Sequence, residues 1–223
     1  MKIWVAGSTG LIGKSLVQLL LAEPKAEHVT ALVRRPHWPP HPKLEELVVD
    51  FEQLETSLAG RQPTHAVCCL GTTIAKAKTQ EAFRHVDFDY PLALARAARD
   101  AGAHTFLLVS SLGANAKSSV FYNRVKGELE DALSALGFPT LHVVRPSLLL
   151  GERAEHRLGE QLASVVGRPL RHVLFGPLRK FAPIEGLEVA RALVALGSDP
   201  RGGHFVHESD EVARIGKAYA PGS

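Results

Sequence analysis

A tyrosine and a lysine four residues apart have the chemistry of a proton donor for a carbonyl reaction. Tyr122 and Lys126 fall in a stretch, residues 119–136, whose pattern predicts a long helix. A spacing of four puts both side chains on one helical face. A phenol has an ordinary pKa of about 10, and a neighbouring ammonium favours its charged form. The pair could therefore protonate an alkoxide, or remove the alcohol proton in the reverse reaction.

Two serines stand where this chemistry would need a hydrogen-bond donor. Ser110 and Ser111 follow the predicted strand 105–109, and the carboxyl ends of strands are where open α/β sheets build their sites. A hydroxyl at that place can donate to a carbonyl oxygen, although a loop serine can instead bond to nearby backbone. We expect Ser111 to face the pocket, with Ser110 as the alternative.

Three glycines lie where the first predicted strand turns into the first predicted helix. Gly7 allows a tight turn, Gly10 allows close approach of a pyrophosphate, and Gly13 allows the helix to pack closely on the strand. Backbone N–H groups at the helix N-terminus would then hold the phosphates. In this context the spacing predicts a dinucleotide site, the alternative being a tight turn without a ligand.

The residues at the next strand ends indicate which dinucleotide would bind. Arg34 and Arg35 follow strand 28–33, where an NAD site would carry an acidic residue. A guanidinium suits a 2′-phosphate, so we expect NADP(H). Asp50 could accept from the adenine amino group or cap the helix that follows. Gly71 could let the chain pass close to the cofactor, or it could simply end its strand.

Strands and helices alternate along most of the chain. Apolar runs predict strands at 3–6, 28–33, 47–49, 66–70, 105–109 and 140–144, and helices at 11–22, 52–58, 80–87, 91–101 and 119–136. This alternation predicts an α/β fold, a Rossmann-type doubly wound parallel sheet. We expect one domain over residues 1–223, in which 151–223 form a small C-terminal lobe with helices at 154–166, 187–197 and 209–219.

Composition excludes several classes of protein. The 223 residues carry a formal net charge of only +3, which predicts no nucleic-acid partner. No apolar run approaches the roughly 18 residues needed to cross a bilayer, so no membrane partner and a cytoplasmic location are expected. The adjacent cysteines, Cys68 and Cys69, are interpreted as core thiols of a reducing compartment. The spacing of the histidines predicts no metal site.

These motifs resemble the short-chain dehydrogenase/reductase superfamily. More closely they resemble its atypical branch, which contains the Tat-interactive, oxidoreductase-like protein TIP30. The similarity covers roughly residues 1–200, in the stretches 7–13, 33–35, 49–51, 68–73, 110–114, 117–119, 122–128 and 145–146.

The resemblance implies a Rossmann fold that binds NADP(H). Tyr122 would be the proton donor or acceptor, and Lys126 would contact the nicotinamide ribose. The remaining implied cofactor residues are Thr9, Gly10, Leu11 and Ile12 at the phosphates, Arg34 and Arg35 at the 2′-phosphate, Leu70 and Gly71 along the cofactor, and Leu149 and Arg157 closing over it.

Two departures from the family pattern bear on activity. Where many members carry an asparagine in the helix after the fourth strand, this chain has Asp87, and the tail after Arg145 is short. We expect an NADP(H)-dependent oxidoreductase acting on a small carbonyl or alcohol. The alternative is a regulatory protein that senses NADP(H) without turnover and binds a protein partner.

Overall fold

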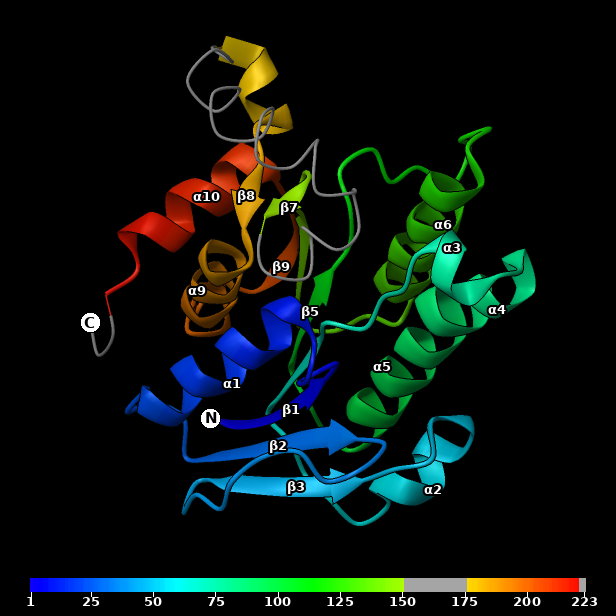
Figure 1. Cartoon of the computed structure of the whole chain (residues 1–223). Helices are drawn as coiled ribbons and strands as arrows, with labels where there is room; N and C mark the ends of the chain where they lie inside the picture. Colours follow the sequence, from blue (N-terminus) through cyan, green and yellow to red (C-terminus); the bar gives the residue numbers. More distant parts are fainter. Residues whose placement is uncertain (151–175, 221–223) are drawn as a thin grey trace.

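The structure, a computed structural model, describes residues 1–150 and 176–220. Seven parallel strands form its main sheet in the order β3-β2-β1-β4-β5-β6-β9 (Figure 1). The strands are β1 (Lys2–Ala6), β2 (His28–Val33), β3 (Leu44–Val48), β4 (His65–Cys68), β5 (Thr105–Val109), β6 (Thr140–Arg145) and β9 (Gly203–Glu208). The order reverses between β1 and β4, and at such a point an open α/β sheet leaves a crevice outside its carboxyl edge. The Rossmann-type prediction is confirmed.

Alternate residues of β1 show why helices cover both faces of the sheet. Ile3 and Val5 are buried against α1 (Leu11–Ala22), α9 (Gly186–Gly197) and α10 (Ser209–Ala218). Trp4 and Ala6 point the other way, into a core with α2 (Leu54–Leu58), α5 (Tyr90–Asp100) and α6 (Phe121–Ala135). The two helical layers lie on opposite sides of the sheet in Figure 1. Strands buried on both faces are continuous apolar runs, so the sequence reveals them clearly.

The helical region after β4 differs from its prediction. The sequence predicts helices at 80–87 and 91–101 with a break between them. Instead α4 (Gln80–Arg84) continues through a π-helical turn, η2 (His85–Asp89), straight into α5. In a regular helix the ring of Pro91 would clash with the carbonyl of Asp87, four residues earlier. The wider turn accommodates the proline without a break, and such turns are frequent at functional sites.

Residues 176–220 extend the sheet and one helical layer. β8 (Ile184–Glu185) pairs in parallel with β7 (Leu149–Leu150), α9 packs along α1, and β9 joins the main sheet beside β6. A 3-10 helix, η3 (Gly176–Phe181), precedes β8. The helix predicted for 154–166 lies outside the described residues, and the division into one domain with a lobe at 151–223 stays a prediction.

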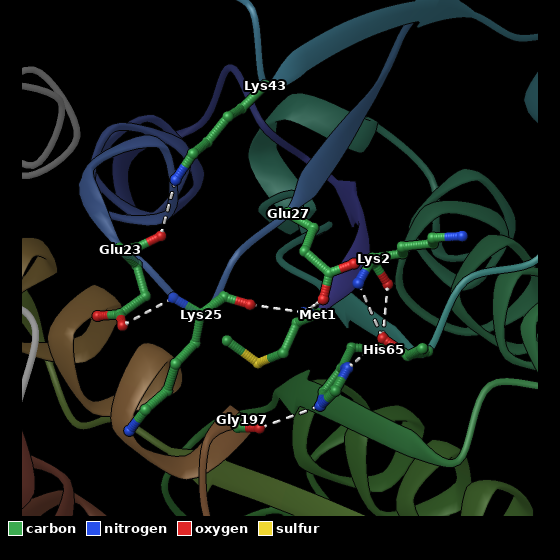
Figure 2. Close-up of polar contacts among 9 residues, drawn as sticks. Met1, Lys2, Glu23, Lys25, Glu27, Lys43, His65 and Gly197 are labelled. Carbon is green, nitrogen blue, oxygen red and sulfur yellow. Dashed lines mark hydrogen bonds and ion pairs between the residues drawn. The ribbon is translucent and has the colours of Figure 1, made fainter.

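Polar contacts join the elements at the amino edge of the sheet, away from the crevice. Figure 2 shows the His65 ring reaching the carbonyl oxygen of Gly197 at the end of α9, with Nε2 3.0 Å from that oxygen. The Lys43 ammonium donates to the Glu23 carbonyl oxygen at 3.1 Å. These contacts link β4 with α9, and the start of β3 with the end of α1. Within the described part of the chain, every helix is too short or too polar to cross a membrane.

Candidate cofactor and active site

A cavity of about 320 Å³ lies along the carboxyl edge of the sheet where the strand order reverses. Its walls come from the glycine turn, the ends of β2 and β4, and the helical region after β4. They comprise Gly7, Thr9, Gly10, Leu32, Val33, Arg34, Phe51, Cys69, Leu70, Gly71, Thr72, Lys76, Val86 and Tyr90. We call this cavity the crevice. Six residues expected at the cofactor therefore line one space: Gly7, Thr9, Gly10, Arg34, Leu70 and Gly71.

The glycine turn has the geometry that its spacing predicts. Gly7 has φ +77°, and a Cβ there would lie 2.5 Å from the backbone oxygen of Cys69. A Cβ on Gly13 would lie 2.1 Å from the oxygen of Gly7. Gly7 is therefore required by its left-handed backbone and its contact with the end of β4. Gly13 is required because the first turn of α1 packs directly on the loop before it.

The start of α1 can accept an anionic group. Gly10 caps the helix without any side-chain hydrogen bond, so the first helical N–H groups have no side-chain acceptor. The Ser8 hydroxyl is buried without a hydrogen-bond partner in the described structure. A helix N-terminus of this kind binds phosphate through its N–H groups and dipole. The crevice thus has the local chemistry to hold a dinucleotide pyrophosphate.

A second cavity, of about 610 Å³, adjoins the crevice at the end of β2. It is lined by Thr9, Val33, Arg34, Arg35 and His37, and it shares the first three with the crevice. Both arginines are exposed, and neither forms an ion pair in the described part of the chain. Their guanidinium donors are therefore available to an anion at this end of the crevice.

A buried ion pair lies behind the other wall of the crevice. Lys126 Nζ is 2.8 Å from Asp87 Oδ1, and the two side chains are 3% and 1% exposed. Burial by itself would lower the pKa of Lys126, but the Asp87 carboxylate, with a smaller contribution from Tyr122, raises it above its ordinary value. A Cβ on Gly71 would lie 3.9 Å from Lys126 Nζ, so this charged ammonium is next to the strand end that lines the crevice.

Tyr122 lies one helical turn before Lys126 at the start of α6, as predicted. Its ring packs on buried Phe83 of α4, with ring centroids 5.5 Å apart, and it is only half-buried. Tyr122 also contributes to the raised pKa of Lys126. The aromatic contact fixes one side of the ring, and the side chain as a whole remains partly exposed.

The two serines at the end of β5 have different environments. Ser110 is buried, and its hydroxyl donates to Glu130 Oε1. Glu130 also accepts from Arg145 Nε at 3.1 Å, so Ser110 belongs to a polar network that ties β5, α6 and β6 together. Ser111 is half-buried, and its hydroxyl makes no hydrogen bond within the described chain. Of the two hydroxyls, that of Ser111 is therefore the available one.

Several residues expected at the cofactor have other surroundings. Ile12 is buried in the core between α1 and the sheet, and the Leu11 side chain packs close to Gly186. Neither side chain lines the crevice. The Asp50 carboxylate accepts from the Glu52 backbone N–H at 3.0 Å and caps a short 3-10 helix. Leu149 packs on the core from β7. Arg157 lies outside the described residues.

Sequence reasoning missed an apolar wall of the crevice. Phe51 follows β3, while Val86 and Tyr90 lie four residues apart on the π-helical turn and the start of α5. The Tyr90 hydroxyl donates to Glu52 Oε1. Burial, followed by this contact with Glu52, raises the Tyr90 pKa to about 12, so Tyr90 is neutral at ordinary pH. The spacing of four in a helix after β4 is the signal that could have indicated these residues.

Comparison with known proteins decides the family. A family model described as NAD(P)H-binding matches residues 7–154, which include the glycine turn, both strand ends and the Tyr122–Lys126 helix. The chain belongs to this family. Its membership agrees with the crevice, and the resemblance to short-chain dehydrogenase/reductases is confirmed.

Curated relatives cover most of the chain. "Protein FMP52, mitochondrial" of Debaryomyces hansenii is 35% identical over 206 residues, 90% of this chain and 89% of that protein. "Protein HTATIP2" of Rattus norvegicus is 39% identical over 166 residues, 72% of this chain and 68% of that protein. The match to HTATIP2 confirms the expected branch, the atypical one that contains the Tat-interactive protein TIP30. The chain is therefore a member of an NAD(P)H-binding, oxidoreductase-like group within the short-chain dehydrogenase/reductase superfamily.

The relatives correct the expected location. The proteins from Debaryomyces hansenii, Candida albicans and Coccidioides immitis all carry the word "mitochondrial" in their names, so the cytoplasmic expectation is wrong. It rested on free thiols and on the lack of a long apolar run. Neither feature distinguishes one reducing compartment from another.

Solved structures support the fold alone. MoeE5 in complex with UDP-glucuronic acid and NAD has a TM-score of 0.67 at 19% identity, with 92% of this chain and 75% of that chain covered. The UDP-glucose 4-epimerase of Thermotoga maritima with UDP-glucose also has a TM-score of 0.67, at 15% identity, with 100% of this chain and 85% of that chain covered. The shared Rossmann architecture extends over nearly the whole described chain.

Proposed function

We propose that this chain is an NADP(H)-dependent oxidoreductase that reduces a small aldehyde or ketone, or oxidises the corresponding alcohol. One observation carries the proposal: the crevice and its adjoining cavity extend from two arginines at the end of β2 to Gly71, behind which lies the charged, buried Lys126. Neither arginine forms an ion pair with the residues that the structure describes. The arginines suit a phosphorylated ribose, and the lysine suits a reaction in which negative charge develops on oxygen.

Different residues would hold different parts of the cofactor. Thr9, Gly10 and the N-terminus of α1 would hold the pyrophosphate, and Arg34 and Arg35 would hold the 2′-phosphate. Support for NADP(H) over NAD comes from the adjoining cavity with its arginines and from the lack of an acidic residue directly after β2. The adenine would lie against the apolar wall of the crevice.

The chain's own side chains supply the proton. When bound, a reduced nicotinamide supplies the hydride that a carbonyl carbon requires. Tyr122 donates its phenolic proton to the carbonyl oxygen, so that the O–H bond of the tyrosine breaks as that of the alcohol forms. The Lys126 ammonium stabilises the resulting phenolate. Ser111 donates a hydrogen bond that orients the substrate oxygen, and in the reverse reaction Tyr122 accepts the alcohol proton.

A turnover assay with a matched variant tests this function. NADPH consumption is followed with a panel of small aldehydes and ketones, with UDP-sugars included as a separate substrate class. Tyr122→Phe should lower kcat at least about 10²-fold while the NADPH Kd stays within about twofold, because only the proton donor is removed. An equal kcat in the unmodified chain and in Tyr122→Phe would contradict the role of Tyr122 as the proton donor.

A second candidate is a protein that senses NADP(H) without turnover. The observation that favours it is Asp87, which stands where many family members carry asparagine and holds Lys126 directly. Tight NADPH binding with no turnover over the whole panel would favour the sensor, whereas turnover with any carbonyl would exclude it.

A further inference from the structure

The carboxylate of Asp87 is held from two directions immediately behind the crevice. Oδ1 lies 2.8 Å from Lys126 Nζ, and Oδ2 accepts from the backbone N–H of Thr72 at 2.8 Å. A Cβ on Gly71 would lie 3.4 Å from Oδ1. The π-helical turn of η2 presents Asp87 at this place. Both charges therefore lie against the strand end that forms the crevice wall.

The net charge at this wall depends on residue 87. With aspartate, the ammonium and the carboxylate cancel. Asparagine would leave one uncompensated positive charge wherever the pH is low enough to keep the buried amine of Lys126 protonated. Both side chains are almost completely excluded from water, so solvent screens a change in charge only weakly. An oxidised nicotinamide ring is positively charged and the reduced ring is neutral. A lone ammonium would therefore disfavour the oxidised cofactor selectively.

We propose that Asp87 is a positioning residue that also sets cofactor redox preference. It holds the Lys126 ammonium against Gly71 and cancels its charge, so that the crevice accepts both NADP⁺ and NADPH. This inference rests on the proposed function, because it places the reactive ring at the Gly71 end of the crevice. Without Asp87 the site would become selective for the reduced form.

Binding measurements test the inference without any turnover. The Kd values of NADP⁺ and NADPH are measured by calorimetry for the unmodified chain, for Asp87→Asn and for Asp89→Asn. In Asp87→Asn, measured at pH 6.5 so that the buried amine of Lys126 stays protonated, the ratio of the NADP⁺ Kd to the NADPH Kd should rise about tenfold. Asp89 lies in the same turn but is half exposed and contacts His85, so Asp89→Asn should leave the ratio unchanged.

A second variant keeps the inference testable if Asp87→Asn does not fold. Lys126→Gln leaves the Asp87 carboxylate without its ammonium partner. At pH 9 the ratio of the NADP⁺ Kd to the NADPH Kd should therefore fall in this variant. An unchanged ratio in the folded variants would overturn the role of Asp87. If the unmodified chain binds neither nucleotide, the proposed function itself fails, which is a different result.

Discussion

Ser110 and Ser111 adjoin in sequence, yet the structure gives their hydroxyls different tasks. Ser110 is buried and donates to Glu130, whereas the half-buried Ser111 makes no side-chain hydrogen bond to the described residues. Ser111→Ala should therefore lower kcat about 10²-fold, the usual effect of removing one donor to a developing oxyanion. Its free energy of unfolding should change little. Steady-state kinetics and urea denaturation together measure both quantities.

Ser110→Ala should show the reverse pattern. Removing a buried donor to a carboxylate should lower the free energy of unfolding by about 1.5–3 kcal/mol. The remaining folded enzyme should keep most of its kcat. If Ser110→Ala loses activity as severely as Ser111→Ala at equal folded fraction, the assignment of the two hydroxyls is wrong.

Helix α6 carries the proposed proton donor and the ammonium, and Gly127 determines where it lies. A Cβ on Gly127 would be 2.1 Å from the backbone nitrogen of Ala116, so a side chain would push α6 away from the loop after β5. Gly127→Ala should lower the free energy of unfolding by about 1–3 kcal/mol or more. Denaturation with urea measures this change.

Gly197→Ala, in α9, is the matched control for Gly127→Ala in α6. Gly197 ends α9, and its nearest neighbour to a new Cβ is 4.0 Å away. The substitution should be neutral or slightly stabilising, because alanine favours helix over glycine by up to about 1 kcal/mol. Similar effects of the two substitutions would show that the close approach of α6 to its loop is unimportant.

Elements with a strong local signal could be predicted from the sequence. The bounds of α1, β2 and β5 agree with their predictions because apolar runs, glycines and prolines determine them locally. The π-helical turn at 85–89 was missed, since Pro91 suggests a break and no residue pattern specifies a widened turn. The crevice wall of Phe51, Val86 and Tyr90 was missed for a different reason. It exists only after the sheet brings distant segments together.

Over the whole molecule, buried histidines make stability depend on pH. Burial, with His104 nearby, lowers the pKa of His65 to about 4, and burial, with His207 nearby, does the same for His142. Their pKa in the unfolded chain is about 6.5. Because the folded pKa is the lower one, stability is complete above pH 6.5 and is lost as the pH falls toward 4.

Chemical denaturation between pH 7 and pH 4.5 measures this loss. Each histidine should remove up to about 1.4 kcal/mol of unfolding free energy per pH unit within that range. His142→Phe keeps a ring that can stack on Phe205 but cannot titrate, so its slope should be shallower. An identical slope in the variant would mean that His142 is not buried in its neutral form.

The proposed activity requires a crevice that binds a phosphorylated dinucleotide. The most direct test is a calorimetric titration of NADPH and NADH into the unmodified chain, the Arg34→Ala/Arg35→Ala double variant and an Arg96→Ala control on the exposed face of α5. We predict that the double variant weakens NADPH binding about 10²-fold or more. NADH binding should fall by no more than about threefold, and the control should match the unmodified chain. Equal losses for both nucleotides would contradict the role of Arg34 and Arg35 at a 2′-phosphate, and an unmodified chain that binds neither nucleotide would contradict cofactor binding in the crevice.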